Sequence, residues 1–140
     1  MIMTRNQTYL AFDYGLRRIG VAIGNSLTRT ARPLQTISWY TKTQRDTALD
    51  KLIKEWQPTC FILGLPIDAF DREHEMTRVC RNFGVYLTER FKLPVEFVDE
   101  RYTSQIAESE TSENTDAYAA TLILEQYLNT LNTQSNQLSE

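Results

Sequence analysis

The chain opens with two segments in which apolar positions alternate with small or polar ones. Residues 8–14 place Leu10, Phe12 and Tyr14 on one face. Residues 19–24 place three β-branched residues on one face, whereas the other face carries only glycine and alanine. The short turn between the segments predicts an antiparallel hairpin. The bare face of its second strand allows a helix or a substrate backbone to approach the sheet closely.

The rest of the chain alternates between helical and strand patterns. Apolar residues at helical spacing predict helices, and short continuous apolar runs predict strands that are buried on both faces. In order, the pattern predicts a strand at 34–39, a helix at 43–56, a strand at 60–65, a helix at 73–91, a strand at 95–98 and a helix at 115–131. This order predicts an α/β fold with a mixed five-stranded sheet, whose first three strands are antiparallel and whose two faces both carry helices.

One domain accounts for the whole pattern. A length of 140 residues suits one domain, and the sequence has no internal repeat and no linker rich in Pro, Gly or Ser. We expect a single domain over residues 8–131 with loose segments at 1–7 and 132–140, because both ends are polar. Cys60 and Cys80 belong to no metal-binding or redox motif, and no apolar run is long enough to span a membrane. We therefore expect a reduced, cytoplasmic protein.

Charge is distributed unevenly along the chain. The net charge is -3, but residues 1–95 hold 14 basic and 9 acidic residues, whereas residues 96–140 hold 1 basic and 9 acidic residues. An acidic total argues against a non-specific nucleic-acid binder, which usually carries a basic face. A basic patch in the first part could still contact phosphate. The acidic cluster could instead hold Mg²⁺ and reach phosphate through the metal.

Three acidic positions stand out, although each one alone has an ordinary structural explanation. Asp13 interrupts an apolar strand, where an unpaired charge is costly, yet it could simply shape the turn at Gly15. Asp99 and Glu100 follow a late strand, as solvated loop charges also do. Asp116 shares the inner stripe of the last helix, but an acid in the first turn also suits the helix dipole. Together, these carboxylates could converge at one sheet edge and bind a hard ion such as Mg²⁺ or Mn²⁺.

The sequence offers little other chemistry. His74 is the single histidine and lies among charged residues, where a solvated side chain is expected. No phosphate-binding glycine loop, dinucleotide-binding motif or serine nucleophile motif occurs. Two metal ions held by carboxylates can activate water and stabilise the leaving oxygen of a phosphodiester. Phosphodiester cleavage is therefore the chemistry that the acidic positions favour.

Five blocks of sequence resemble the YqgF family, in the same order and spacing. They are AFDYGLRRIGVAIGNS, TARPLQTI, FILGLPID, VEFVDERYTS and DAYAATLILEQYL, and the resemblance covers residues 9–128. Members of this family are named as pre-16S ribosomal RNA nucleases or as proteins that resemble Holliday junction resolvases. The resemblance implies a ribonuclease-H-like fold, and it implies an enzyme: a metal-dependent nuclease.

The resemblance also assigns roles to particular residues. Asp13, Glu100 and Asp116 match the catalytic metal ligands, with Asp99 as a competitor of Glu100 for the second position. Mg²⁺ or Mn²⁺ is the implied cofactor. Four further positions match substrate-binding or loop-bracing residues, and they are Arg17, Arg18, Arg101 and Thr103.

Two departures from the family pattern bear on function. Residues 107–115 are short and acidic where many members carry a longer basic segment, and residues 70–72 lack the glycine that is usual there. The favoured function remains cleavage of structured RNA, in 5′-end maturation of pre-16S rRNA during ribosome biogenesis. The alternatives are a nuclease of DNA junctions and a non-catalytic RNA-binding factor of the pre-ribosomal small subunit. The sequence is compatible with a monomer or a homodimer and indicates no membrane partner.

Overall fold

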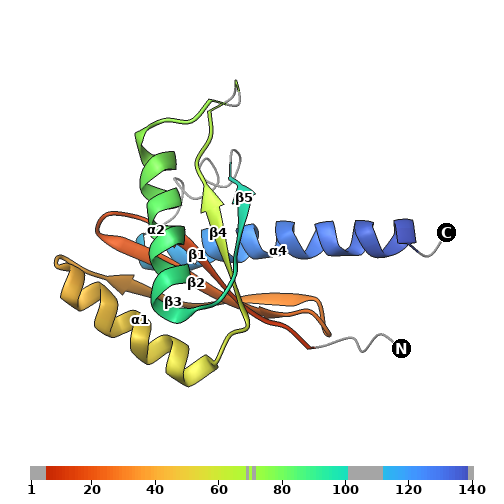
Figure 1. The fold of residues 1–140 in the computed structure, drawn as a ribbon, viewed down its shortest axis with the longest axis horizontal. Coiled ribbons are helices and arrows are strands. Elements are labelled where there is room, and N and C mark those ends of the chain that lie inside the picture. Colours follow the sequence, from red (N-terminus) through yellow and green to blue (C-terminus); the bar gives the residue numbers. More distant parts are fainter. Residues whose placement is uncertain (1–5, 69, 71, 101–111, 139–140) are drawn as a thin grey trace.

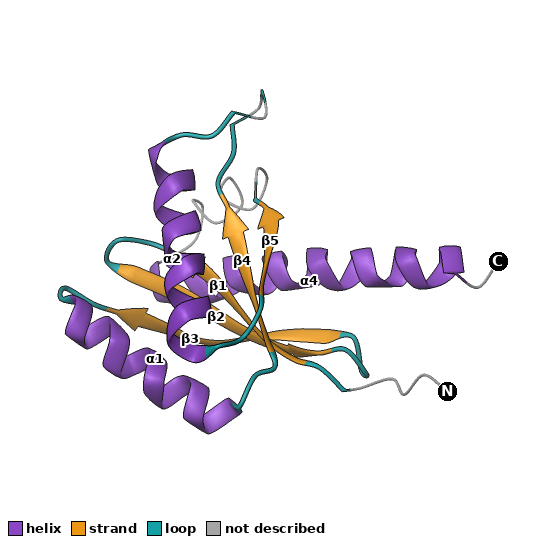
Figure 2. Ribbon diagram, viewed as in Figure 1, coloured by secondary structure: helices purple, strands orange, loops and turns teal. Residues whose placement is uncertain are grey.

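Five strands and three helices make up the part of the chain that is described. The structure is a computed structural model, and it describes residues 6–68, 70, 72–100 and 112–138. The elements are β1 (Thr8–Tyr14), β2 (Arg18–Asn25), β3 (Thr30–Ser38), α1 (Lys42–Trp56), β4 (Cys60–Leu65), α2 (Glu75–Phe91), β5 (Val95–Asp99) and α4 (Ser112–Leu138) (Figures 1 and 2).

The five strands form one mixed sheet in the order β3-β2-β1-β4-β5. The pairs β1–β2 and β2–β3 are antiparallel, and the pairs β1–β4 and β4–β5 are parallel. This arrangement confirms the prediction from the sequence. Because β1, β4 and β5 run in the same direction, their carboxyl ends meet at one edge of the sheet, where ligands bind in many α/β proteins.

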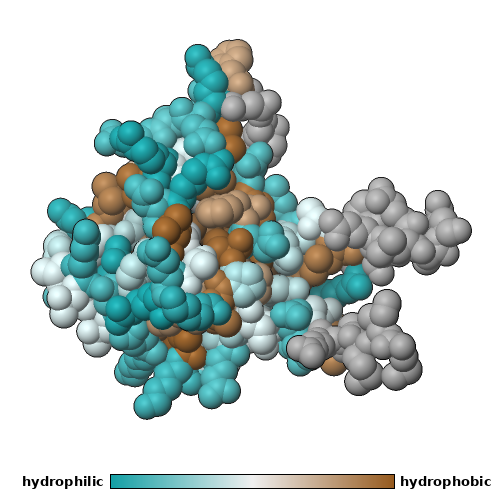
Figure 3. Space-filling view, in the orientation of Figure 1, coloured by the Kyte–Doolittle hydropathy of each residue, from teal (hydrophilic) through white to brown (hydrophobic). Residues whose placement is uncertain are grey.

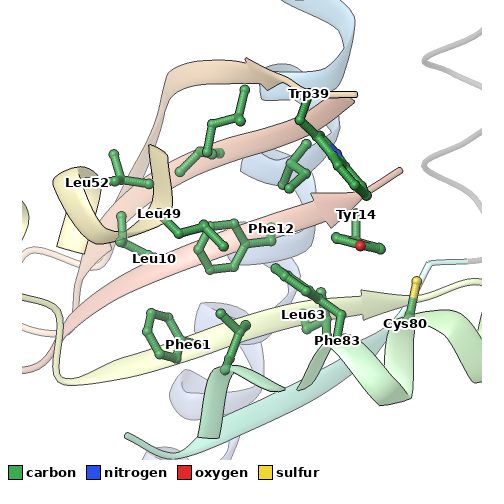
Figure 4. Close-up of a cluster of buried hydrophobic side chains, with 14 of the residues drawn as sticks. Leu10, Phe12, Tyr14, Trp39, Leu49, Leu52, Phe61, Leu63, Cys80 and Phe83 are labelled. Atoms are coloured by element: carbon green, nitrogen blue, oxygen red, sulfur yellow. The ribbon is translucent and has the colours of Figure 1, made fainter. Parts of the chain in front are cut away.

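Helices cover both faces of the sheet, as the pattern predicts. On one face, α1 and α2 pack on a core that includes Leu10, Phe12 and Phe61 (Figure 4). On the other face, α4 packs on a second core, which includes Ile62 and Ile123. Figure 1 shows α4 crossing behind the strands and extending beyond the sheet. The two cores hold the sheet rigidly between layers, so the side chains at its edge have fixed positions.

Glycine on β2 explains why α4 lies so close to the sheet. A Cβ atom added to Gly20 would overlap the backbone of Asp116 and Ala117. Farther along the strand, a Cβ atom added to Gly24 would lie 2.6 Å from a methyl carbon of Leu124. Helix α4 therefore occupies the bare face of β2. The two glycines allow the first turns of this helix to pack directly against the sheet.

Several element boundaries differ from the sequence prediction, and three of the differences have a clear physical reason. Helix α1 is capped by Thr41 and Gln44 rather than by Thr43, with both bonds of a capping box present. Strand β3 begins at Thr30, earlier than predicted. Its first residues were missed because an edge strand with exposed side chains lacks the apolar pattern that marks a strand. Helix α4 continues to Leu138, beyond the end predicted at residue 131. No Gly or Pro after residue 112 interrupts the helix.

The face drawn in Figure 3 is mainly hydrophilic, with apolar side chains near its middle and at smaller places elsewhere. Exposed apolar side chains on α2 and β5 include Val85 and Phe97. Among the described residues, no helix is both long enough and apolar enough to cross a membrane.

Candidate functional site

Asp13 and Glu100 meet at the edge where the parallel strands end. Asp13 lies near the end of β1, and Glu100 directly follows β5, with β4 between them. The backbone N–H of Glu100 donates to the Leu65 carbonyl oxygen at 3.0 Å, which fixes the chain where it leaves the sheet. The two carboxyl groups share a hydrogen bond. The structure thus brings together two residues that are 87 positions apart in the sequence.

Gly64 makes room for this contact. It lies on β4 between the two acids, and a Cβ atom there would lie 2.7 Å from Oε2 of Glu100 and 2.6 Å from Cδ1 of Ile123. The Glu100 side chain therefore crosses β4 on the face that α4 covers. Sequence analysis did not identify Gly64 as part of the site. The available signal was a glycine inside the buried apolar run 60–65, because such a glycine often marks a close approach by another group.

Burial shifts the pKa values of both carboxyl groups upward. Desolvation, together with the negative charge of Asp116, raises the pKa of Asp13 to about 6, although the hydrogen bond from Glu100 acts in the opposite direction. Desolvation, the charge of Asp13 and the shared hydrogen bond raise the pKa of Glu100 to about 8. The pair therefore keeps a proton at pH values where isolated carboxyl groups are ionised.

Asp116 approaches the same place from α4. The helix backbone at Asp116 lies on Gly20, which pairs with Asp13 across the β1–β2 ladder. The Asp116 carboxylate accepts a hydrogen bond from Nε of Arg18 at 2.6 Å. The Arg18 side chain is 47% exposed and that of Asp116 is 19% exposed, so solvent reaches this ion pair mainly at Arg18.

The donor set suits a hard divalent ion. The carboxyl groups of Asp13 and Glu100 are in contact, and once both are ionised, a cation between them offsets their repulsion. Within the ranges that the structure describes, however, no three acidic, histidine or cysteine side chains are close enough together to hold one ion. Asp116 is paired with Arg18, and a change of side-chain rotamer is needed for it to join the other two acids.

Comparison with known proteins assigns the chain to a family. A family model named RuvX, described as Holliday junction resolvase, matches residues 7–130. The chain belongs to the RuvX family. A relative from Paraburkholderia phytofirmans is 48% identical over 133 residues and covers 91% of each chain. A relative from Polynucleobacter necessarius is 46% identical over 131 residues, covering 92% of this chain and 89% of its own. Both relatives carry the name "Putative pre-16S rRNA nuclease".

Solved structures with the same fold are junction resolvases. The Thermus thermophilus RuvC complex with a Holliday junction substrate superimposes with a TM-score of 0.58 at 10% identity, covering 91% of this chain and 96% of its own. The fowlpox virus resolvase bound to junction DNA gives a TM-score of 0.55 at 11% identity, covering 89% and 98%. These similarities confirm the ribonuclease-H-like fold of this RuvX-family protein. Its family and its named relatives make the protein a nuclease.

The remaining site residues of the RuvX-family chain lie in different environments. Asp99 is exposed, and its charge acts on Arg81 of α2, on the opposite side of the sheet from α4. The charge of Asp99 thus acts on the α2 side of the sheet, whereas the Glu100 carboxyl group contacts Asp13. Arg17 lies in the β1–β2 turn with its guanidinium 5.5 Å from the centre of the Tyr40 ring. Arg101 and Thr103 lie outside the described residues.

Proposed function

We propose that this protein is a divalent-metal-dependent nuclease of the cytoplasm that matures the 5′ end of the 16S ribosomal RNA precursor. The observation that carries the proposal is the contact between the half-buried Asp13 and Glu100, with Asp116 beside it. Such a contact is costly without a cation, so its presence at the ligand-binding edge of the sheet favours a metal site. The names of the relatives support ribosomal RNA as the substrate.

Asp13, Glu100 and Asp116 are the residues that would hold Mg²⁺ or Mn²⁺. When bound, such ions activate water and stabilise the leaving oxygen of a phosphodiester. Glu100 gives up its proton for this role, because only the carboxylate form is a metal ligand. Gly64 keeps the space that the Glu100 carboxylate occupies above β4. Gly20 allows α4 to bring Asp116 alongside Asp13.

Arg18 has two possible partners in this scheme. In the structure, its guanidinium pairs with Asp116 at 2.6 Å. If Asp116 turns to a metal ion, the guanidinium becomes available to a phosphate of the substrate, which it can hold by charge-assisted hydrogen bonds. Metal binding by Asp116 would then release Arg18 to bind the nucleic acid.

Resolution of DNA junctions is the second candidate function. The description of the family model favours it, since that description names Holliday junction resolvase. The metal chemistry of the site is the same for both substrates, because RNA and DNA share the phosphodiester that is cleaved.

One experiment tests the proposal and separates its alternatives. Purified protein is incubated with a 5′-extended 16S precursor and, separately, with a synthetic four-way DNA junction, each with Mg²⁺, Mn²⁺ or EDTA. We expect metal-dependent cleavage of the precursor and no cleavage in EDTA. Cleavage of the junction alone would favour the resolvase function. Precursor binding without cleavage in any metal would indicate an assembly factor and contradict the proposal.

A further inference from the structure

An exposed aromatic side chain lies beside the turn between β1 and β2. Tyr40 lies between β3 and α1, and 76% of its surface is exposed. Its neighbour Trp39 is buried and makes two bonds to the β1–β2 turn. The Trp39 backbone N–H donates to the Arg17 carbonyl oxygen at 2.9 Å, and its indole N–H donates to the Gly15 carbonyl oxygen at 3.2 Å. These bonds of Trp39 hold the backbone next to Tyr40 against the turn that carries Arg17 and leads to Arg18.

The exposure of Tyr40 does not come from a loosely held backbone. Its N–H donates at 2.8 Å to the side-chain oxygen of Gln44, which also accepts from Thr41 in the capping box of α1. The adjacent Trp39 packs beside Tyr14 in the core (Figure 4). A large, flat side chain is thus held in solvent by a fixed backbone. Tyrosine held in this way offers contact area at a small cost in conformational entropy.

Two consecutive arginines, Arg17 and Arg18, lie in and directly after the turn beside the ring. The Arg17 guanidinium is 5.5 Å from the centre of the Tyr40 ring. The next residue, Arg18, pairs with Asp116, whose charge in turn acts on Asp13. The turn beside the exposed ring thus also carries the arginine that pairs with an acid of the proposed metal site.

We propose that Tyr40 is a stacking site for an unpaired nucleobase of the RNA substrate, with Arg17 holding the phosphate of that nucleotide. This inference rests on the proposed nuclease function and adds a preference for single-stranded RNA beside the cleaved bond. Every nucleobase has a flat face that stacks on an aromatic ring, and the adjacent cation matches the charge of the backbone. A base inside a duplex has both faces covered by its neighbours, so only an unpaired base can stack on Tyr40.

Binding measured in EDTA tests this site without cleavage. The probes are a fluorescein-labelled 12-nucleotide single-stranded RNA and a duplex of the same sequence, and fluorescence anisotropy gives the dissociation constants. We expect Tyr40→Ala to weaken single-strand binding by about tenfold and Tyr40→Phe to retain it, because stacking needs the ring and not the hydroxyl. Duplex binding should stay within about twofold of the wild type for both variants.

Leu27→Ala is the matched control. Leu27 is 71% exposed, and it follows β2 at the end of that strand opposite Arg18. We expect this variant to bind both probes as the wild type does. Thermal melting of all variants checks that they are folded, as the exposure of both side chains predicts. A loss of single-strand affinity in Leu27→Ala as large as that in Tyr40→Ala would overturn the stacking site.

A fluorescent base gives a second readout that a purely structural role would not move. Stacking changes the fluorescence of 2-aminopurine, so RNA with this base at each position in turn locates the contact. We expect one position to change with the wild type and not with Tyr40→Ala. Equal single-strand affinity in Tyr40→Ala and the wild type would overturn the inference, while wild-type cleavage of the precursor would leave the proposed function standing. Wild-type protein that neither binds nor cleaves RNA would overturn both.

Discussion

At the scale of single residues, the contact between Asp13 and Glu100 is the costliest feature of the site. Desolvation raises the pKa of each group, to about 6 for Asp13 and to about 8 for Glu100. In the unfolded chain, both groups titrate near pH 4. The folded protein therefore binds these protons more tightly than the unfolded chain does. This difference stabilises the fold at low pH, and the stabilisation is lost as pH rises through the two folded pKa values.

The tighter proton binding of the folded state sets the pH dependence of stability without metal. In EDTA, we expect the free energy of unfolding to fall between pH 5 and pH 8 as the pair becomes charged. Glu100→Gln keeps the shape without the charge, so it should be more stable than the wild type at pH 8 by on the order of 2 kcal/mol and nearly equal to it at pH 5. Urea unfolding of both proteins at the two pH values measures this. Parallel pH profiles would contradict the assignment of the shift to this pair.

Arg18 gives a second prediction at this scale. Because its guanidinium occupies Asp116, it competes with a cation for that carboxylate. We expect Arg18→Gln to bind Mn²⁺ about two- to fivefold more tightly, the size of effect that a partly exposed ion pair allows. Isothermal titration calorimetry measures the affinity. Arg17→Gln is the control, since Arg17 lies over Tyr40 and should leave Mn²⁺ affinity nearly unchanged. Weaker Mn²⁺ binding in Arg18→Gln would show that Arg18 supports the metal site instead.

At the scale of elements, the packing of α4 on β2 positions the third acid. A methyl group at Gly20 overlaps the backbone of Asp116 and Ala117, so the helix must move to admit it. We expect Gly20→Ala to cost about 2–3 kcal/mol of stability and to weaken Mn²⁺ binding, because the shift carries Asp116 away from Asp13. Unfolding and calorimetry measure the two effects.

Gly24→Ala is the matched control for this prediction. It also crowds α4, at Leu124, but it lies at the far end of β2 from the site. We expect lower stability with unchanged Mn²⁺ affinity. Equal losses of affinity in both variants would mean that the position of the helix start does not set the metal site.

The elements that could be predicted are those in which burial imposes a clear period. The alternation at residues 8–14 and the apolar run at 60–65 predicted β1 and β4 as the structure has them. Strand β3 begins earlier than predicted because its exposed edge carries no apolar period. The end of α4 was missed because polar residues can continue a helix when no Gly or Pro stops it.

The site was predictable only in part for a similar reason. Asp13 and Glu100 could be expected at one sheet edge from strand direction alone. The role of Gly64 and the ion pair of Arg18 with Asp116 depend on how closely α4 approaches the sheet. That approach is a tertiary distance, and local sequence patterns do not encode it. The sequence alone could not decide between Asp99 and Glu100 as the second ligand. The structure separates them, because the charge of Asp99 acts on Arg81 of α2.

At the scale of the whole molecule, the protein and its proposed substrate both carry negative charge and repel each other. The chain carries a net charge of -3, so it must bind an anionic polymer through a local group of cations. Arg18, at the start of β2, pairs with Asp116, and Arg17 precedes it in the β1–β2 turn. Binding should therefore depend on a few phosphate contacts and not on the overall field of the protein.

Salt dependence tests this localisation. For single-stranded RNA, we expect Arg17→Ala to reduce the slope of log affinity against log salt by about 0.7, the value for one lost phosphate contact. Lys54→Ala should leave the slope unchanged, because Lys54 is exposed in the last turn of α1, near the amino end of β4 and away from the site. Anisotropy titrations at several salt concentrations provide the slopes. Equal slopes for the wild type and Arg17→Ala would remove Arg17 from the phosphate-binding surface.

The central claim is that the Asp13–Glu100 pair is a metal site, and Mn²⁺ binding to Asp13→Asn tests it most directly. The substitution keeps the shape of the side chain and removes its charge. We expect Mn²⁺ affinity, measured by calorimetry, to fall at least about tenfold, since one carboxylate ligand is lost. We expect metal-free stability at pH 8 to hold or rise, because one member of a repelling pair is gone. Unchanged Mn²⁺ affinity in a folded Asp13→Asn protein would contradict the account.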